Sequence, residues 1–187
     1  MIPVRVSFAV DFSTDRTSNT RKAALWSLAA RVAELRPKAS KLDIAGALYA
    51  RERLGTTAMG GGVALPHTVL TDEDASMIVV RRLERPVEFD APDGMAVDTL
   101  VALMGGKHDI KWLRAALLRL GRLAQQGPLR HQLRTATTQD EVAAVLAALG
   151  LDVHTDQKFC ENARTVQAEG RAALGMTGRA QHSIALR

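Results

Sequence analysis

The stretch of the chain best suited to chemistry lies between Arg51 and His67 and reads RERLGTTAMGGGVALPH. His67 ends a short apolar run, and we expect it at the end of a strand, facing a turn built from Gly60, Gly61 and Gly62. Glycines let backbone N–H groups approach an anion without interference from side chains. A neutral imidazole nitrogen is a competent nucleophile towards a phosphoryl group at physiological pH. The pattern therefore predicts a phosphohistidine, with a purely structural histidine as the alternative.

Other common kinds of reactive site are not indicated by the sequence. The chain has no GxxxxGK[ST] segment, so the glycine run is not a nucleotide P-loop. Its single cysteine, Cys160, excludes an internal disulfide and a CxxC metal site. We therefore expect neither a metal ion nor a cofactor.

The formal net charge of +5 and the sequence pI of about 9.9 raise the question of nucleic-acid binding. The basic residues are interspersed with acids, as in residues 51–53 and 81–85, and they form no long cluster. No zinc-finger, RNP or basic-zipper spacing accompanies them. We expect a solvated, mildly basic surface and no nucleic-acid partner.

Nothing in the sequence indicates insertion into a membrane. No apolar run reaches the roughly 18 residues that are needed to span a bilayer. The first residues lack the basic and apolar regions of a secretory signal. We therefore expect a cytoplasmic protein.

The first part of the chain reads as two helices after an extended segment. Residues 4–12 predict a short strand or an extended lead-in. A helix is expected over residues 18–36, where Pro37 ends it. A second helix is expected to open at Ser40, because Asp43 follows three residues later in the spacing of a capping box.

The middle of the chain reads as strands and the following part as helices. Short strands flank the glycine turn, and further strands are expected at residues 76–83, 86–89 and 97–104. Three helices follow, and these are expected at 110–126, directly after 127–128, and at 138–149. The order of helices, strands and helices predicts an α/β domain with a sheet between helical layers. This domain spans residues 1–150, and residues 151–187 are expected to form a C-terminal tail, partly helical or disordered.

Three segments resemble one known family, the enzyme IIA domains of the fructose/mannitol and nitrogen-regulatory (PtsN-like) phosphotransferase system. The segment that ends at His67 is similar to the family's R-E-x-x-G-S/T-T-G-I-G-x-G-I-A-I-P-H. Residues 83–98 resemble its L-x-x-P-I-x-F-D-A-x-D-G-x-P-V-D stretch, and residues 129–141 resemble its C-terminal segment. The resemblance covers residues 4–149.

The resemblance implies a mixed β-sheet between helical layers and a role as a phosphocarrier of the bacterial phosphoenolpyruvate-dependent system. His67 matches the family's phosphoacceptor, which would take a phosphoryl group from HPr or from its nitrogen-branch counterpart. It would pass the group to an enzyme IIB domain, or hold it as a signal for a regulatory target such as a kinase, a transporter or a transcription factor. Sugar-specific and nitrogen-regulatory roles both remain open.

The resemblance also implies roles for the residues around His67. Arg51 matches the family's arginine and would be the counter-charge to the phosphoryl oxygens. Thr57 and the amides of the Gly60–Gly62 turn are expected to orient these oxygens. The structural alternatives are a helix-terminal cation for Arg51, which the helix dipole favours, and an ordinary strand residue for Thr57.

The sequence departs from the family at a second histidine. This histidine usually stands at the start of the helix after strand 97–104, beside the phosphorylated one. An ungapped register puts Leu113 there, and His108 lies five residues earlier in a glycine-containing loop. His108 would substitute only if the loop takes another path, and it is otherwise a solvated loop residue. The alternative function is therefore a phosphorylation-impaired enzyme IIA-like module that works by binding.

Overall fold

The computed structural model describes residues 6–36, 38–70, 76–125 and 128–151, and for residues 6–14 it describes the backbone. The predicted tail lies outside these residues except for its first residue, so the division at residue 150 stays a prediction. The elements, in chain order, are β1 (Val6–Asp15), α1 (Arg21–Leu35), α2 (Lys41–Arg53), β2 (Ala58–Gly60), β3 (Val63–Ala64), β4 (His67–Leu70), β5 (Ser76–Val87), β6 (Val97–Gly106), α3 (Ile110–Gln125), α4 (Pro128–Thr135) and α5 (Gln139–Ala148).

The strands form one six-stranded sheet in the order β1-β5-β6-β3-β2, and β4 also pairs with β6. The pairs β1–β5, β3–β6 and β4–β6 are parallel, whereas β5–β6 and β2–β3 are antiparallel. The sheet is therefore mixed, as the resemblance implied. Strand β6 is buried along its whole length, which explains why its sequence is nearly continuous in apolar residues.

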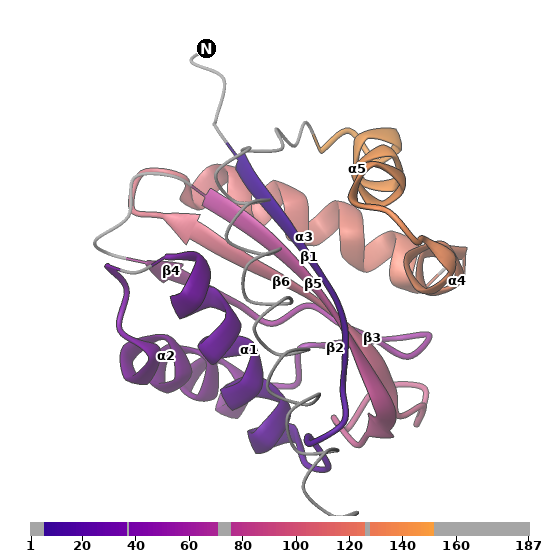
Figure 1. The fold of residues 1–187 in the computed structure, drawn as a ribbon, viewed down its shortest axis with the longest axis horizontal. Helices are drawn as coiled ribbons and strands as arrows, with labels where there is room; N and C mark the ends of the chain where they lie inside the picture. The colour runs from indigo at the N-terminus through magenta and orange to yellow at the C-terminus, as the bar shows by residue number, and fades with distance from the viewer. Residues whose placement is uncertain (1–5, 37, 71–75, 126–127, 152–187) are drawn as a thin grey trace, which may run out of the picture.

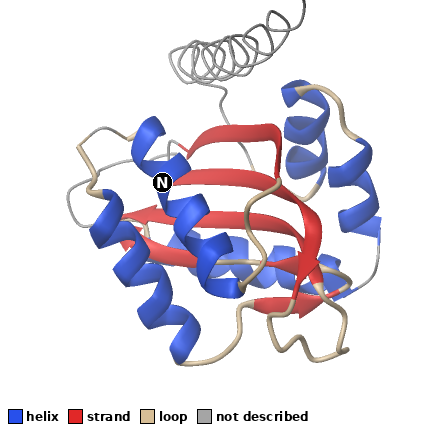
Figure 2. Cartoon of the chain, turned by 60° about the horizontal axis from the view of Figure 1, so that its bottom comes forward, coloured by secondary structure: helices blue, strands red, loops and turns tan. Residues whose placement is uncertain are grey.

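Helices cover both faces of the sheet (Figures 1 and 2). The core on one face joins α1 and α2 to Leu100 and Ala102 of β6, and the core on the other face joins α3, α4 and α5 to Val101 and Leu103. Successive residues of a strand point to opposite faces, so one strand serves both cores. The predicted sandwich of a sheet between helical layers is confirmed.

Local signals in the sequence set several helix boundaries. Thr20 caps α1 by accepting a hydrogen bond from the Ala23 amide, and Ser40 accepts one from the Asp43 amide at the start of α2. Thr138 forms the complete capping box of α5. These caps fix where each helix begins.

One strand prediction was wrong. Residues 86–89 were expected to form a separate short strand, but β5 runs without interruption to Val87. The pairing of β5 with β6 shifts register between Arg82 and Val87, and this irregularity accommodates Pro86 within the strand.

Candidate functional site

His67 opens β4 at the margin of the sheet. It pairs with Leu103 of β6, and the carbonyl of Pro66 accepts a hydrogen bond of 2.9 Å from the Leu103 amide. Among the strands that the structure describes, β6 is the one neighbour of β4. The His67 side chain is half-buried, so the ring is held in place and still reaches the surface.

Both nitrogens of the His67 ring have hydrogen-bond partners. Nδ1 lies 2.8 Å from the carbonyl oxygen of Leu65, and Nε2 lies 2.9 Å from Nε of Arg51. A carbonyl oxygen only accepts hydrogen bonds and a guanidinium only donates them, so Nδ1 must carry the proton and Nε2 the lone pair. The surroundings therefore favour one tautomer of the ring, in which Nε2 is the unprotonated, nucleophilic nitrogen.

The surroundings also keep the ring neutral. Burial is the largest influence and lowers the pKa of His67 below its ordinary value of 6.5. The hydrogen bond to Leu65 and the charge of Glu52 act in the opposite direction, whereas the positive charge of Arg51 lowers the pKa further. A ring with a lowered pKa is unprotonated at neutral pH, which is the state that a nucleophile requires.

Arg51 reaches His67 from the last turn of α2. Its Nη1 donates a hydrogen bond of 2.8 Å to the carbonyl oxygen of Gly55, just beyond the helix. This second bond fixes the plane of the guanidinium against the ring of His67. The structure thus brings together Arg51 and His67, the first and last residues of the segment 51–67.

Thr57 is bonded to the carboxylate of Glu52, the residue next to Arg51. It is buried, and its hydroxyl donates a hydrogen bond of 2.6 Å to Oε2 of Glu52. The Thr57 amide bonds the same carboxylate, and Arg21 lies 3.8 Å from it. The Thr57 hydroxyl is therefore engaged in holding the turn after α2. Glu52 is a site residue that sequence reasoning missed, although it stands next to Arg51 in the resembling segment.

The glycine turn is not brought next to His67. On β6, Val63 pairs with Thr99 whereas His67 pairs with Leu103, four residues further along. At about 3.3 Å per residue, the backbone at Val63, where the turn ends, lies roughly 13 Å from the backbone at His67 along β6. The amide of Gly61 instead donates a hydrogen bond of 2.7 Å to the carboxylate of Asp93. The expectation that this turn faces the histidine is thus not met.

The backbone conformation and the close packing of this turn require glycine. Gly60, Gly61 and Gly62 all have positive φ, at 92°, 60° and 72°. A Cβ on Gly61 would lie 2.7 Å from the backbone oxygen of Ala124, and one on Gly62 would lie 2.7 Å from Arg130. The turn packs tightly against α3 and α4, and glycine is what permits that approach.

Among the described residues, no other histidine is bonded to His67 as a counterpart of the family's second histidine. Leu113 is 5% exposed in the core under α3, where it packs on Gly105. His108 is exposed in the turn between β6 and α3, and within the described ranges no hydrogen bond or ion pair joins it to another residue. Because His67 pairs with Leu103, His108 lies five residues beyond that level of the sheet. No contact of the described residues joins His108 to His67, and its role as a substitute stays a prediction.

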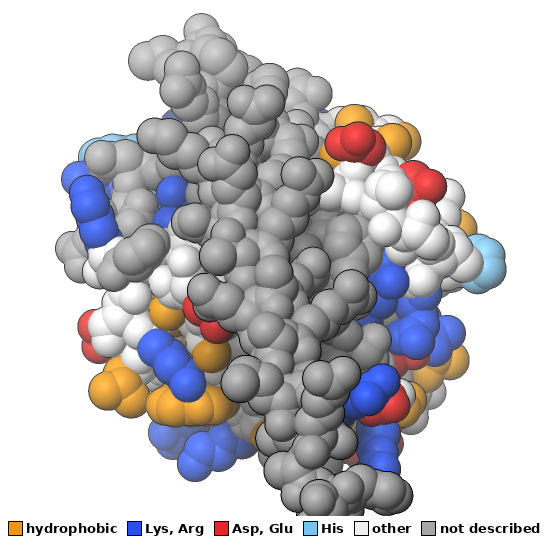
Figure 3. Space-filling model, viewed as in Figure 1, with side chains coloured by type: hydrophobic (Ala, Val, Ile, Leu, Met, Phe, Trp, Pro, Cys, Tyr) orange, Lys and Arg blue, Asp and Glu red, His pale blue; other side chains and the backbone are white. Residues whose placement is uncertain are grey.

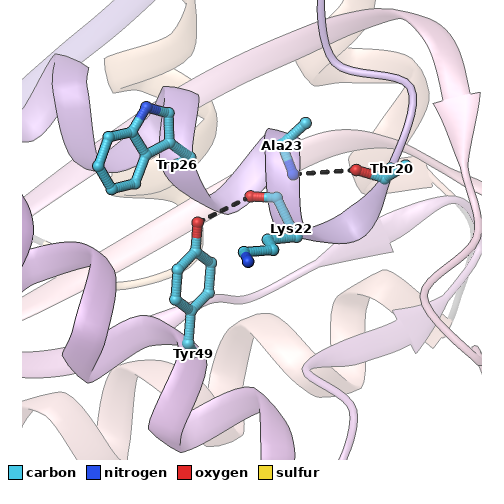
Figure 4. Close-up of a pocket in the computed structure, with 5 residues that line it drawn as sticks. All are labelled: Thr20, Lys22, Ala23, Trp26 and Tyr49. Carbon is cyan, nitrogen blue, oxygen red and sulfur yellow. Dashed lines mark hydrogen bonds between the residues drawn. The ribbon is translucent and has the colours of Figure 1, made fainter.

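A groove on the helical layer of α1 and α2 lies apart from these residues (Figure 4). Its volume is about 520 Å³, and it is lined by Thr20, Lys22, Ala23, Trp26 and Tyr49. The Tyr49 hydroxyl donates to the Lys22 carbonyl at 3.1 Å, which ties α2 to α1. His67 and Arg51 do not line this groove.

The described part of the chain lacks two further features. It holds no group of three or more His, Cys, Asp or Glu residues that could bind a metal ion. No helix among these residues has the length and apolar character needed to cross a membrane.

Comparison with known proteins agrees with this geometry. Residues 9–148 match the family described as phosphoenolpyruvate-dependent sugar phosphotransferase system, EIIA 2. The nitrogen regulatory protein of Bradyrhizobium diazoefficiens is 35% identical over 133 residues, which are 69% of this chain and 84% of that protein. The nitrogen regulatory protein of Pseudomonas aeruginosa is 32% identical over 138 residues, which are 74% of this chain and 87% of that protein.

Solved structures have the same fold. The nitrogen regulatory protein IIA-Ntr from Neisseria meningitidis superposes with a TM-score of 0.63 and 27% identity, over 76% of this chain and 92% of that one. IIA mannitol from Escherichia coli superposes with a TM-score of 0.55 and 16% identity, over 73% of this chain and 94% of that one. The family predicted from the three sequence segments is confirmed: the chain belongs to the EIIA 2 family of the phosphoenolpyruvate-dependent sugar phosphotransferase system.

Proposed function

We propose that the chain is a regulatory phosphocarrier of the phosphotransferase system and that His67 accepts the phosphoryl group on Nε2. The observation that carries the proposal is the pair of hydrogen bonds on the ring, from Nδ1 to Leu65 and from Arg51 to Nε2. These bonds leave the lone pair on Nε2 and place this atom beside the guanidinium of Arg51. A purely structural histidine has no need of a lone pair capped by a guanidinium.

The transfer step follows from this arrangement. The Nε2 lone pair attacks the phosphorus of a phosphohistidine donor, the donor's P–N bond breaks, and the donor imidazole leaves with that electron pair. The His67 ring keeps its proton on Nδ1, and the Leu65 carbonyl stabilises the positive charge that develops on the ring. The net result moves one phosphoryl group between two histidines.

Arg51 must change partner during this step. In the resting site its Nε–H occupies the Nε2 lone pair, so the guanidinium has to withdraw before phosphorus can approach. The same group is then within reach of the new phosphoryl oxygens, which a guanidinium binds well. Arg51 thus protects the nucleophile before transfer and neutralises charge after it.

The other predicted site residues receive indirect roles. Thr57 acts through Glu52, because their hydrogen bonds fix the turn to which Arg51 is anchored. The Gly60–Gly62 turn supports the packing of β2 and β3 on α3 and α4 and does not contact the phosphoryl group. His108 takes no part in the step.

A protein donor fits this site. The reactive pair is half-buried at the margin of the sheet, outside the groove of the α1–α2 layer, so it suits a phosphoryl group carried by another protein. HPr or its nitrogen-branch counterpart is the proposed donor. The Escherichia coli IIA mannitol protein forms a complex with phosphorylated enzyme IIB, and an enzyme IIB domain or a regulatory target is the corresponding acceptor for this chain.

One observation favours a second candidate function, that of a binding module with slow phosphoryl transfer. Leu113 occupies the place of the second histidine and is buried in the core, and among the described residues no other imidazole bonds to His67. A module of this kind would bind its target equally well whether His67 is intact or replaced by alanine.

Incubation of the full chain with phosphoenolpyruvate, enzyme I and HPr tests the proposal. We expect one acid-labile, base-stable phosphate per chain, its absence in His67→Ala, and its retention in the controls His108→Ala and His131→Ala. Phosphate that remains in His67→Ala would refute the assignment. No labelling of the wild type by HPr or by its nitrogen-branch counterpart would favour the binding module.

A further inference from the structure

The positive charge of the chain is concentrated in one segment. Residues 105–136 contain seven Lys and Arg residues against one Asp, whereas the rest of the chain contains 18 basic and 19 acidic residues. The whole excess of positive charge therefore belongs to the segment that forms α3 and α4. Basic side chains also group on the flank where α4 lies in the space-filling view (Figure 3).

The outer face of α3 carries Lys111, Arg114, Leu118 and Arg122, which we call the basic stripe. Their spacing of i, i+3, i+7 and i+11 aligns them along one side of the helix, over about 16 Å at 1.5 Å per residue. All four are exposed, and Leu118 is 65% exposed. The opposite face of α3 packs on the sheet through residues such as Leu120.

The basic stripe has no acidic partner among the residues that the structure describes. Helix α3 contains no acidic residue, and in the described parts of the chain no carboxylate pairs with Lys111, Arg114 or Arg122. Lys111 and Arg114 lie at the N-terminal end, where the helix dipole disfavours cations. Arg119, which lies beside the stripe, is occupied by a hydrogen bond of 2.5 Å to the Gly150 carbonyl, and its spacing from Arg122 is that of a repulsive pair. The helix therefore has charges that no carboxylate of the described residues compensates.

We propose that the basic stripe is a docking surface for an acidic protein helix, with carboxylates on either side of one apolar side chain that packs on Leu118. Charge complementarity selects an acidic partner, and the leucine at the centre selects a protein. A phosphate backbone gains nothing from an exposed apolar side chain at the middle of its contact. A membrane surface would need a wide apolar face, but the apolar face of α3 is buried against the sheet.

A defined peptide tests this proposal on the full chain. The probe is a synthetic 18-residue helical peptide with glutamates along one face and a single leucine at its centre. We expect saturable binding by calorimetry, with amide chemical-shift changes confined to α3. The variant Arg114→Glu/Arg122→Glu should bind about tenfold more weakly, since each reversed surface pair changes binding several-fold. Leu118→Ser should also weaken binding.

Matched controls separate the stripe from general charge and from the phosphoryl site. Lys38→Glu/Arg85→Glu makes the same charge change at two exposed positions elsewhere, and Leu42→Ser removes another exposed leucine, which is 68% exposed. Both should bind like the wild type, as should His67→Ala, so the result does not depend on the proposed function. The proposal is overturned if the peptide does not bind or if the control pair loses as much affinity. It is equally overturned if a DNA duplex or phosphatidylglycerol vesicles bind through the stripe more tightly than the peptide.

Discussion

The two hydrogen bonds on the His67 ring have opposite functions. The bond from Nδ1 to the Leu65 carbonyl, at 2.8 Å, fixes the tautomer and is compatible with a phosphoryl group on Nε2. The bond from Arg51 to Nε2, at 2.9 Å, has to break before transfer. At the scale of single residues, Nδ1 of His67 keeps its hydrogen bond during transfer, whereas Nε of Arg51 has to give up its bond to Nε2.

Replacement of Arg51 should slow phosphoryl transfer more than it affects folding. A hydrogen bond to a charged group contributes about 1.5–3 kcal/mol, and tenfold in rate corresponds to about 1.4 kcal/mol. We therefore expect Arg51→Ala to lower the initial rate of labelling by about 10- to 100-fold. Arg51→Lys should recover only part of this rate, because lysine lacks the planar fork.

The control for this prediction is Arg53→Ala, which removes an exposed arginine two residues away on the same helix end. Its labelling rate should equal that of the wild type. A rate for Arg51→Ala that is also unchanged would show that Arg51 only terminates α2.

The ring of His67 should titrate below 6.5, because burial and Arg51 both lower its pKa. The rate of phosphoryl acceptance should therefore fall with decreasing pH only at a lower pH than for a histidine with the ordinary pKa. The folded ring is harder to protonate than the unfolded one, so its contribution to stability is fully present above pH 6.5 and is lost as the pH falls through the folded pKa. Histidine chemical shifts against pH measure this directly, and a His67 pKa at or above 6.5 would contradict it.

At the scale of the elements, the sequence predicted several helix boundaries and the helical layers on both faces of the sheet. The capping box at Thr138 and the end of α1 at Leu35 depend on local signals, so both could be predicted directly from the sequence. The joining of residues 86–87 to β5 could not, because it depends on pairing with β6 across a register shift. Long-range pairing likewise decides that the glycine turn lies four residues of β6 away from His67.

The glycine turn should matter for stability and not for chemistry. Gly61→Ala places a Cβ at φ 60° and 2.7 Å from the Ala124 carbonyl oxygen. Strain of this kind costs about 1–3 kcal/mol, so the free energy of unfolding measured with urea should fall by about that amount. Labelling of His67 by HPr should persist at temperatures where the variant is folded.

Gly46→Ala is the matched control for the turn. Gly46 lies within α2, and a Cβ there would meet no atom within 4 Å. Alanine should stabilise the helix by about 0.5–1 kcal/mol. Equal stability changes in the two variants, or loss of labelling in folded Gly61→Ala, would contradict the structural role of the turn.

At the scale of the whole molecule, Asp98 connects the sheet to the far helical layer. It is buried on β6, and its carboxylate accepts a hydrogen bond of 3.0 Å from Nε of Arg130 and lies 3.3 Å from Nη1 of Arg134. Both arginines belong to α4 and remain partly exposed. This cluster holds α4 against the glycine turn, because Arg130 also packs on Gly62.

Asp98→Ala should destabilise the protein without altering the reactive pair. The buried hydrogen bonds to charged groups are worth about 1–3 kcal/mol, and the exposed arginines regain water when the carboxylate is removed. Glu84→Ala, which breaks a solvent-exposed pair with Arg16, should cost no more than about 1 kcal/mol. Urea unfolding distinguishes the two, and equal losses would show that the Asp98 cluster adds nothing to the interface of the layers.

Charge was the property of the whole molecule that the sequence described least well. The basic residues of α3 are separated by three or more positions, so they do not form a run of letters, and they were interpreted as a scattered surface. Only the helix places Lys111, Arg114 and Arg122 on one face. The position of Leu113 at the place of the family's second histidine, by contrast, was already visible from the ungapped register, and Leu113 is buried in the structure.

The most direct test of the central claim is a long-range ¹H–¹⁵N spectrum of the His67 ring before and after treatment with phosphoenolpyruvate, enzyme I and HPr. Before treatment, we predict a neutral ring with its proton on Nδ1. After treatment, the nitrogen coupled to phosphorus should be Nε2. A proton on Nε2 in the resting protein, or phosphorus coupled to Nδ1, would contradict the account.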